Sequence, residues 1–126
     1  MKLNKTISIL AGIYGLTAVA LGAFGAHLLK ETLGTQGTTS TWQTAVDYQM
    51  WHALALLFIA NRVQRCGLAK AAGVAFCVGV FLFSASLYWL ALGGPRWLGP
   101  ITPLGGISLI FAWGLLIASF ARRQTD

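Results

Sequence analysis

The chain alternates between four long apolar stretches and short polar connections. The apolar stretches cover residues 6–29, 43–61, 68–92 and 101–121. Each approaches the roughly 20 apolar residues with which a helix crosses the hydrocarbon core of a bilayer. Backbone N–H and C=O groups find no water in that core, so segments of this length are expected to be helical. The pattern predicts an all-α integral membrane protein, in which one domain over residues 1–126 forms a four-helix bundle of up-down topology.

Composition agrees with this class. Hydrophobic residues make up 56% of the chain and charged residues 10%, whereas soluble domains average about 45–50% and about 25%. The first stretch follows Lys2 and Lys5, as in a secretory signal peptide. Its apolar run is longer than a signal core and no clean cleavage site ends it, so we expect it to remain as a span.

The cationic residues predict the orientation. Seven of the nine Lys and Arg residues fall at the two termini and in the connection between the second and third stretches: Lys2, Lys5, Arg62, Arg65, Lys70, Arg122 and Arg123. Only Lys30 and Arg96 fall in the other two connections. Because cytoplasmic segments carry the excess of Lys and Arg, both termini are expected in the cytoplasm. The scattered clusters do not form the single basic face of a nucleic-acid-binding protein.

The two connections on the opposite side differ in kind. Residues 31–42 are rich in Gly and Thr and are expected to form a polar surface loop, with Trp42 in the headgroup zone. Residues 93–106 hold all three prolines and are expected to form a rigid turn before the fourth helix, with Trp97 as a second headgroup residue.

Small residues recur at four-residue spacings. Helices in lipid associate by close packing at such residues, so we expect them to form helix–helix contacts and to support a homo-oligomer. The residues singled out for packing are Gly15, Gly22, Gly25, Ala26, Gly79, Gly105 and Gly106.

Few strongly polar residues lie within the apolar stretches, where each is a candidate site. They are His27 at the end of the first stretch, and Asp47, Tyr48, Gln49 and His52 in the second. On a helix, Tyr48, Gln49 and His52 share one face, whereas Asp47 projects away from His52. We expect a polar cluster on the outer side of the bundle with a structural or ligand-binding role.

Three hypotheses remain open for this cluster. The histidines could each be neutral and hydrogen-bonded, tying helices together. Alternatively, His27 and His52 could bind a metal ion or a haem from facing helices. An oligomeric transporter built around Asp47 is the third. Cys66 and Cys77 are eleven positions apart and form no CxxC motif, and no base is paired in sequence with Ser84 or Ser86. We therefore expect a non-enzymatic protein, and the sequence assigns no cofactor.

Several segments resemble a known family. In chain order they are LGAFGAHLL, AVDYQMWHALALL, FSASLYWLAL, GPITPLGG and FAWGLL, and they are similar to domain of unknown function 423, which includes the bacterial YgdD-like proteins and the animal transmembrane protein 256. The resemblance covers nearly the whole chain and implies a four-span protein of the bacterial inner membrane with no assigned activity. The family motifs fall on Gly22, Gly25, His27, Tyr48, Gln49, His52, Thr102, Pro103, Gly105 and Gly106.

Overall fold

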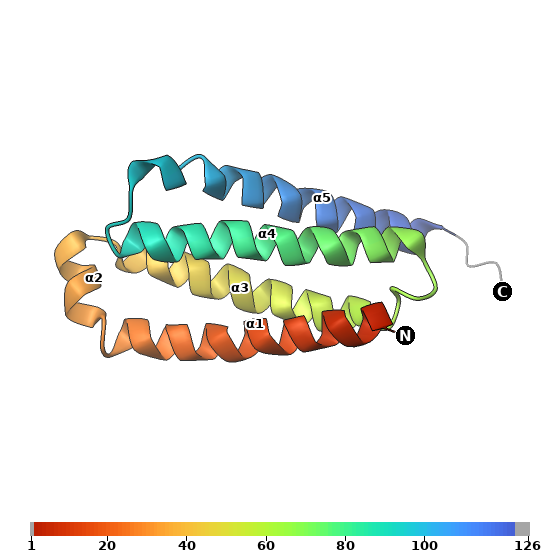
Figure 1. Cartoon of the computed structure of the whole chain (residues 1–126), viewed down its shortest axis with the longest axis horizontal. Coiled ribbons are helices and arrows are strands. Elements are labelled where there is room, and N and C mark those ends of the chain that lie inside the picture. Colours follow the sequence, from red (N-terminus) through yellow and green to blue (C-terminus); the bar gives the residue numbers. More distant parts are fainter. Residues whose placement is uncertain (1, 123–126) are drawn as a thin grey trace.

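A computed structural model describes residues 2–122 of the chain. Over these residues the chain is helical, without strands, as the sequence predicts (Figure 1). The elements are α1 (Lys2–Ala26), α2 (Lys30–Gln36), α3 (Thr39–Ala60), α4 (Gly67–Ala91), the 3-10 turn η1 (Arg96–Leu98) and α5 (Ile101–Ala121). Arg123, expected to add to the cytoplasmic charge, lies outside the described residues.

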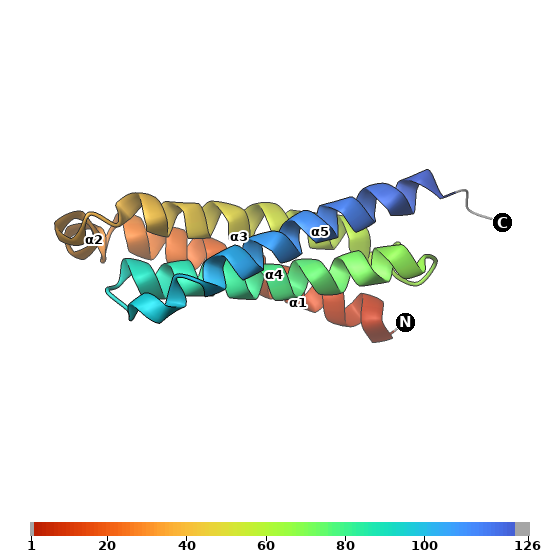
Figure 2. The same cartoon turned by 90° about the horizontal axis from the view of Figure 1, so that it is seen from above.

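The four long helices lie side by side and alternate in direction, so α1 begins and α5 ends at the same end of the molecule (Figures 1 and 2). Neighbours in the chain are neighbours in space: α1 packs on α3, α3 on α4, and α4 on α5. Helix α1 touches α4 only marginally. The pair α3 and α4 is therefore central, with α1 against one member and α5 against the other.

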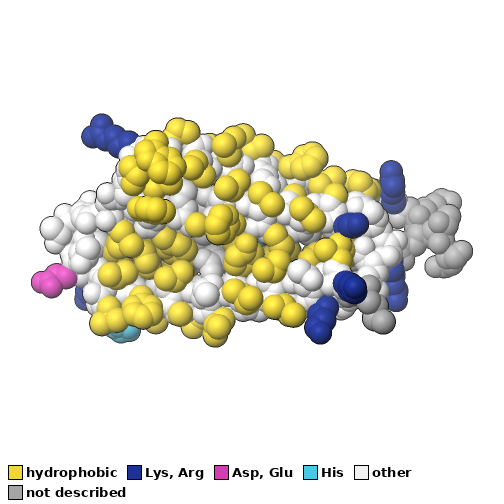
Figure 3. Space-filling model, in the orientation of Figure 1, with side chains coloured by type: hydrophobic (Ala, Val, Ile, Leu, Met, Phe, Trp, Pro, Cys, Tyr) yellow, Lys and Arg dark blue, Asp and Glu magenta, His cyan; other side chains and the backbone are white. Residues whose placement is uncertain are grey.

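Three segments are long and apolar enough to cross a membrane: Lys2–Ala26, Gly67–Ala91 and Arg96–Ala121. Helix α3 is not among them, although it has 22 residues. It is more enclosed than α1, since nine of its 22 residues are buried against four of 25 in α1. Its inward face can therefore carry polar side chains. Figure 3 shows apolar side chains covering the middle of the visible face.

Glycines mark the closest helix approaches. A Cβ on Gly105 would collide with the backbone of Phe83, and one on Gly79 would lie 2.7 Å from Leu109 Cδ2. These two glycines allow α4 and α5 to pack closely, as small residues do in membrane helices. Gly22 lies against Val46 and the space beside Gly25 is filled by the indole of Trp42, so both serve the contact between α1 and α3. Gly106 makes only ordinary contact with the Phe83 ring.

Two of the residues singled out for packing do not serve a contact of this kind. Within residues 2–122, no atom would lie within 4 Å of a Cβ on Gly15, and Ala26 is exposed. The buried residues of α1 are Ile7, Ala11, Ala18 and Gly25, which define a narrower face than the small-residue pattern suggested. Helix α1 has one main neighbour, so most of its circumference faces outward.

The connection over residues 31–42 corrects two expectations. It contains α2 and the start of α3 where an irregular loop was predicted. Gly37 ends α2 with φ 68°, and Thr38 N–H donates to Leu33 O at 2.9 Å, a glycine-terminated helix end. Trp42 was expected at the headgroups and is instead 4% exposed. The space above Gly25 admits the indole, whose Nε1–H donates to Leu21 O at 2.8 Å.

The proline-rich connection agrees with its expected role. Pro100 and Pro103 stand just before and within the first turn of α5, where a missing N–H removes no helical hydrogen bond. Trp97 in η1 is 63% exposed, as a headgroup residue would be.

Candidate functional site

Gln49 is the centre of a buried hydrogen-bond network between three helices. Its side chain is 4% exposed. Nε2 donates to Tyr14 O at 2.9 Å and to Thr17 Oγ1 at 2.6 Å on α1. Oε1 accepts from the Tyr88 hydroxyl of α4 at 2.7 Å. Both N–H groups and the carbonyl are therefore paired, which is the condition under which a buried amide stabilises a fold.

His52 is held one turn further along α3. Its Nδ1 lies 2.6 Å from Tyr48 O, and the Trp113 indole donates to its Nε2 at 3.1 Å. A carbonyl only accepts and an indole N–H only donates, so Nδ1 carries the proton and Nε2 is bare. The ring is thus a neutral imidazole with both nitrogens engaged. Through these two contacts His52 connects α3 to α5.

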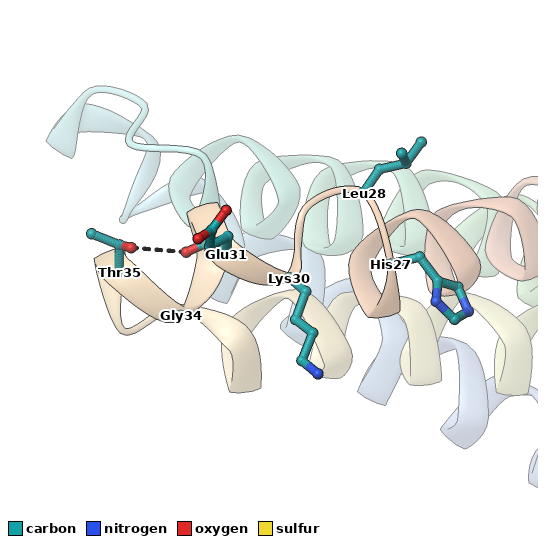
Figure 4. Close-up of a pocket in the computed structure, with 6 residues that line it drawn as sticks. All are labelled: His27, Leu28, Lys30, Glu31, Gly34 and Thr35. Atoms are coloured by element: carbon teal, nitrogen blue, oxygen red, sulfur yellow. Dashed lines mark hydrogen bonds between the residues drawn. The ribbon is translucent and has the colours of Figure 1, made fainter.

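The structure places His27 in a different environment. It is exposed in the turn after α1 and lines a shallow hollow with Lys30 and Glu31. In Figure 4 the His27 and Lys30 side chains extend to one side and the Glu31 carboxylate to the other. His52 is buried and lines a separate pocket. The imidazoles therefore do not converge, and no three His, Cys, Asp or Glu side chains gather anywhere in residues 2–122.

Asp47 also lies apart from His52. It is half-buried, directly before Tyr48 on α3, and its Oδ1 accepts from Gln43 Nε2 at 2.8 Å. The hydrogen bond is local to one helix turn. Of the five predicted polar residues, the structure buries Gln49 and His52 and packs the half-buried Tyr48 against the core. Asp47 is half-buried with a partner on its own helix, and His27 is exposed.

An open pocket beside Tyr48 forms what we call the aromatic groove. It has a volume of about 380 Å³ and lies between α3, α4 and α5, lined by Tyr48, Trp51, His52, Phe83, Gly106, Leu109, Ile110 and Trp113. The Tyr48 ring lies 4.6 Å from that of Phe83 and 5.0 Å from that of Trp51, centroid to centroid. Within residues 2–122 the Tyr48 hydroxyl has no hydrogen-bond partner and is not fully buried.

Sequence reasoning missed most of this lining. Phe83 and Trp113 lie inside ordinary apolar stretches, and nothing local distinguishes them from lipid-facing residues. Trp51 follows Tyr48 by three positions, the spacing at which side chains meet on a helix, and could have been found from that signal.

Long apolar helices that pair their polar side chains inside the fold, and place cationic residues at the ends, define an integral membrane protein. The profile of the family described as "Protein of unknown function (DUF423)" matches residues 21–106. The chain belongs to this family, which confirms the resemblance found in the sequence.

Two relatives match over nearly the full length. The UPF0382 membrane protein YwdK of Bacillus subtilis is 40% identical over 118 residues, which are 91% of this chain and 95% of that protein. The UPF0382 inner membrane protein YgdD of Escherichia coli K12 is 41% identical over 122 residues, 94% and 92% of the two chains. No solved structure matches.

Proposed function

We propose that this protein is a non-enzymatic, four-span component of the bacterial inner membrane, with both termini cytoplasmic, that holds a lipid-soluble molecule in the aromatic groove. The Escherichia coli relative is named an inner membrane protein, and the lipid bilayer is the principal partner. The polar residues of α3 serve two roles: Gln49 and His52 join helices, and Tyr48 faces the bound molecule.

The packing of α3 supports the fourth span. Helix α3 runs alongside α1 and α4, with which it makes extensive contact. Its 22 residues extend about 33 Å at 1.5 Å per residue, close to the thickness of a hydrocarbon core of about 30 Å. Four spans return the chain to its starting side, in agreement with Figure 1, where α1 begins and α5 ends at the same end of the molecule.

The distribution of charge supports the orientation. The end that holds the start of α1, the connection from α3 to α4 and the end of α5 carries Lys2, Lys5, Arg62, Arg65, Lys70 and Arg122. Figure 3 shows Lys and Arg side chains gathered at that end of the visible face. The opposite end has Lys30 and Arg96 and also the acidic Glu31. By the positive-inside rule the first end is cytoplasmic.

Tyr48 is the observation that supports ligand binding. It lies nine residues into α3, roughly 13 Å along the helix from its outer end. A hydroxyl at that depth has no water to bond and costs free energy while unpaired. The flanking rings of Trp51 and Phe83 offer flat apolar contact. The groove thus suits an apolar molecule, rich in flat or chain-like surface, that carries one hydrogen-bond acceptor.

Two glycines of α5 provide a test of the groove. Gly106→Leu would place a side chain into the groove, whereas Gly114→Leu would meet no atom within 4 Å of its Cβ and would face outward. We expect a lipid-soluble compound to copurify with the wild-type protein and the Gly114 variant and to be depleted in the Gly106 variant, measured by mass spectrometry of organic extracts. Equal extracts from all three proteins would refute the groove as a binding site.

Topology has its own test. In a background without Cys66 and Cys77, Thr35→Cys on α2 and Arg65→Cys in the connection after α3 place thiols at opposite ends. A membrane-impermeant thiol reagent applied to spheroplasts should label the Thr35 variant alone. Labelling of the Arg65 variant alone would show that the orientation is the opposite of the proposed one. Labelling of both the Thr35 and the Arg65 variants in sealed spheroplasts would show that α3 does not cross the membrane, which contradicts the even number of spans.

Self-association is a further part of the proposal. Gly12 and Gly15 leave α1 smooth on a side where, in the described part of the chain, neither has a packing neighbour at its Cβ. Small residues on such a face let a second helix approach closely. Cross-linking in membranes should yield a dimer that Gly15→Leu weakens and Gly114→Leu does not.

A further inference from the structure

A second hollow lies at the opposite end of the molecule from α2. Lys2, Asn4 and Lys5 line it from the first turns of α1, and Gln64 closes it from the connection between α3 and α4. We call it the cationic hollow; its volume is about 350 Å³. It shares no residue with the aromatic groove, so its role is independent of the function proposed above.

The side chains of the cationic hollow are rich in hydrogen-bond donors. Each lysine presents three N–H donors and no acceptor. Asn4 Oδ1 accepts from Ser8 Oγ at 3.4 Å, which leaves the Asn4 amide N–H groups free to donate. Gln64 is exposed and brings a second amide. Among the residues that the structure describes, no acidic side chain lines the hollow, so an anion would be attracted by both of its lysines.

Helix α1 begins in this hollow, and the start of the helix strengthens the preference of the hollow for an anion. The first backbone N–H groups of a helix have no partner within it and carry partial positive charge. Acidic residues are favoured there, yet the first turn of α1 has none and instead contains Lys2 and Lys5. Two lysines at this end are repelled by the partial positive charge of the helix N-terminus, and a bound anion would neutralise that repulsion.

We propose that the cationic hollow binds the phosphodiester headgroup of an anionic phospholipid such as phosphatidylglycerol. The source is a lipid, because α1 enters its apolar course within two residues of Lys5, with Ile7 buried and Ile9 52% exposed. The hollow therefore lies at the level where the helix meets the membrane surface. A phosphodiester there can accept hydrogen bonds from both lysines and the two amides while its acyl chains lie along α1.

Thermal unfolding in nanodiscs would test this proposal. Wild-type protein should melt at a higher temperature in discs containing phosphatidylglycerol than in phosphatidylethanolamine alone. Lys2→Gln with Lys5→Gln should abolish that difference, whereas the matched loss of two cations at the other end, Lys30→Gln with Arg96→Gln, should preserve it. At about 1 kcal/mol per cation, the first pair should weaken retention of phosphatidylglycerol roughly thirty-fold in competition by native mass spectrometry.

Two further measurements distinguish a lipid headgroup from free phosphate and test the contribution of the two amides. Inorganic phosphate added to phosphatidylethanolamine discs should leave the melting temperature unchanged; a shift equal to that of the lipid would overturn the assignment to a headgroup. Asn4→Leu with Gln64→Leu removes donors without changing charge and should also weaken retention of phosphatidylglycerol. Equal behaviour of the Lys2 and Lys30 double variants would refute the site. Neither result depends on the aromatic groove, whose test uses extracts of the Gly106 variant.

Discussion

Replacement of Gln49 by leucine is the most informative perturbation of the interior. The change keeps the size of the side chain approximately and removes all its hydrogen bonds: the two donated to α1 at 2.9 and 2.6 Å and the one accepted from Tyr88 at 2.7 Å. Tyr14 O still serves its own helix, and Thr17 Oγ1 still donates to Ile13 O at 2.8 Å. The Tyr88 hydroxyl alone is left in the interior without a partner.

The expected cost follows from these three contacts. Side-chain hydrogen bonds between membrane helices average about 0.6 kcal/mol, so the two bonds to α1 contribute about 1 kcal/mol. A buried hydroxyl left unpaired costs about 1–3 kcal/mol. Gln49→Leu should therefore lower the free energy of unfolding by about 2–4 kcal/mol. The exposed Gln43, which bonds only Asp47 on its own helix, supplies the control Gln43→Leu with an expected change of under about 0.5 kcal/mol.

A double-mutant cycle with Tyr88→Phe tests this reasoning, because the change in the free energy of unfolding should have opposite signs in the two backgrounds. In the wild-type background this change removes a good hydrogen bond and should destabilise by about 1 kcal/mol. In the Gln49→Leu background it removes the orphaned hydroxyl and should stabilise. Reversible unfolding in mixed detergent micelles measures each corner of the cycle. If Tyr88→Phe destabilised both backgrounds equally, the hydrogen bond between Tyr88 and Gln49 would carry no coupling and the network would not hold the helices.

Three further perturbations test the packing and the histidines. Gly105→Ala should lower the free energy of unfolding by about 1–3 kcal/mol because the methyl group meets the Phe83 backbone, whereas Gly114→Ala should be neutral; equal effects would contradict the close approach of α4 and α5. In the absence of metal, His52→Ala should reduce the melting temperature, whereas His27→Ala should leave it unchanged. If the two histidines shared a metal site, the two variants would instead behave alike. Trp113→Phe should shift the nitrogen-15 resonance of His52 Nε2 toward that of an unbonded ring nitrogen, and an unchanged resonance would refute the bond.

The long helices could be predicted from the sequence because each apolar run is much longer than a transmembrane β-strand, which needs only about 9–11 residues. Their bounds differ from those of the apolar runs. The sequence predicts the first stretch at 6–29, whereas α1 covers Lys2–Ala26. Lys and Leu are good helix formers, so residues 2–5 can continue the helix beyond the uncharged run. Helix α2 was missed because KETLGTQ is short, polar and interrupted by glycine, and its helix is completed by the turn at Gly37.

The site could be predicted only as far as one helix extends. Spacing along α3 predicts that Tyr48, Gln49 and His52 share one face, but it could not indicate which residues of other helices they contact. Their partners come from three other helices: Tyr14 on α1, Tyr88 on α4 and Trp113 on α5. Each of these aromatic residues lies in a stretch of unremarkable hydropathy. The pairing depends on the rotation of four helices about their axes, which local periodicity does not determine.

The modest hydropathy of α3 is a consequence of its position. A span that faces lipid must be apolar over most of its circumference, because an unpaired polar group in hydrocarbon costs several kcal/mol. Helix α1 obeys this rule: only four of its 25 residues are buried within the protein. Helix α3 lies between α1 and α4, and that shielding allows it to carry Gln49 and His52, whose hydrogen bonds then fix the rotation of its neighbours. Polarity in the second stretch thus indicates a central helix, whose buried polar side chains meet α1, α4 and α5 and not the surroundings of the bundle.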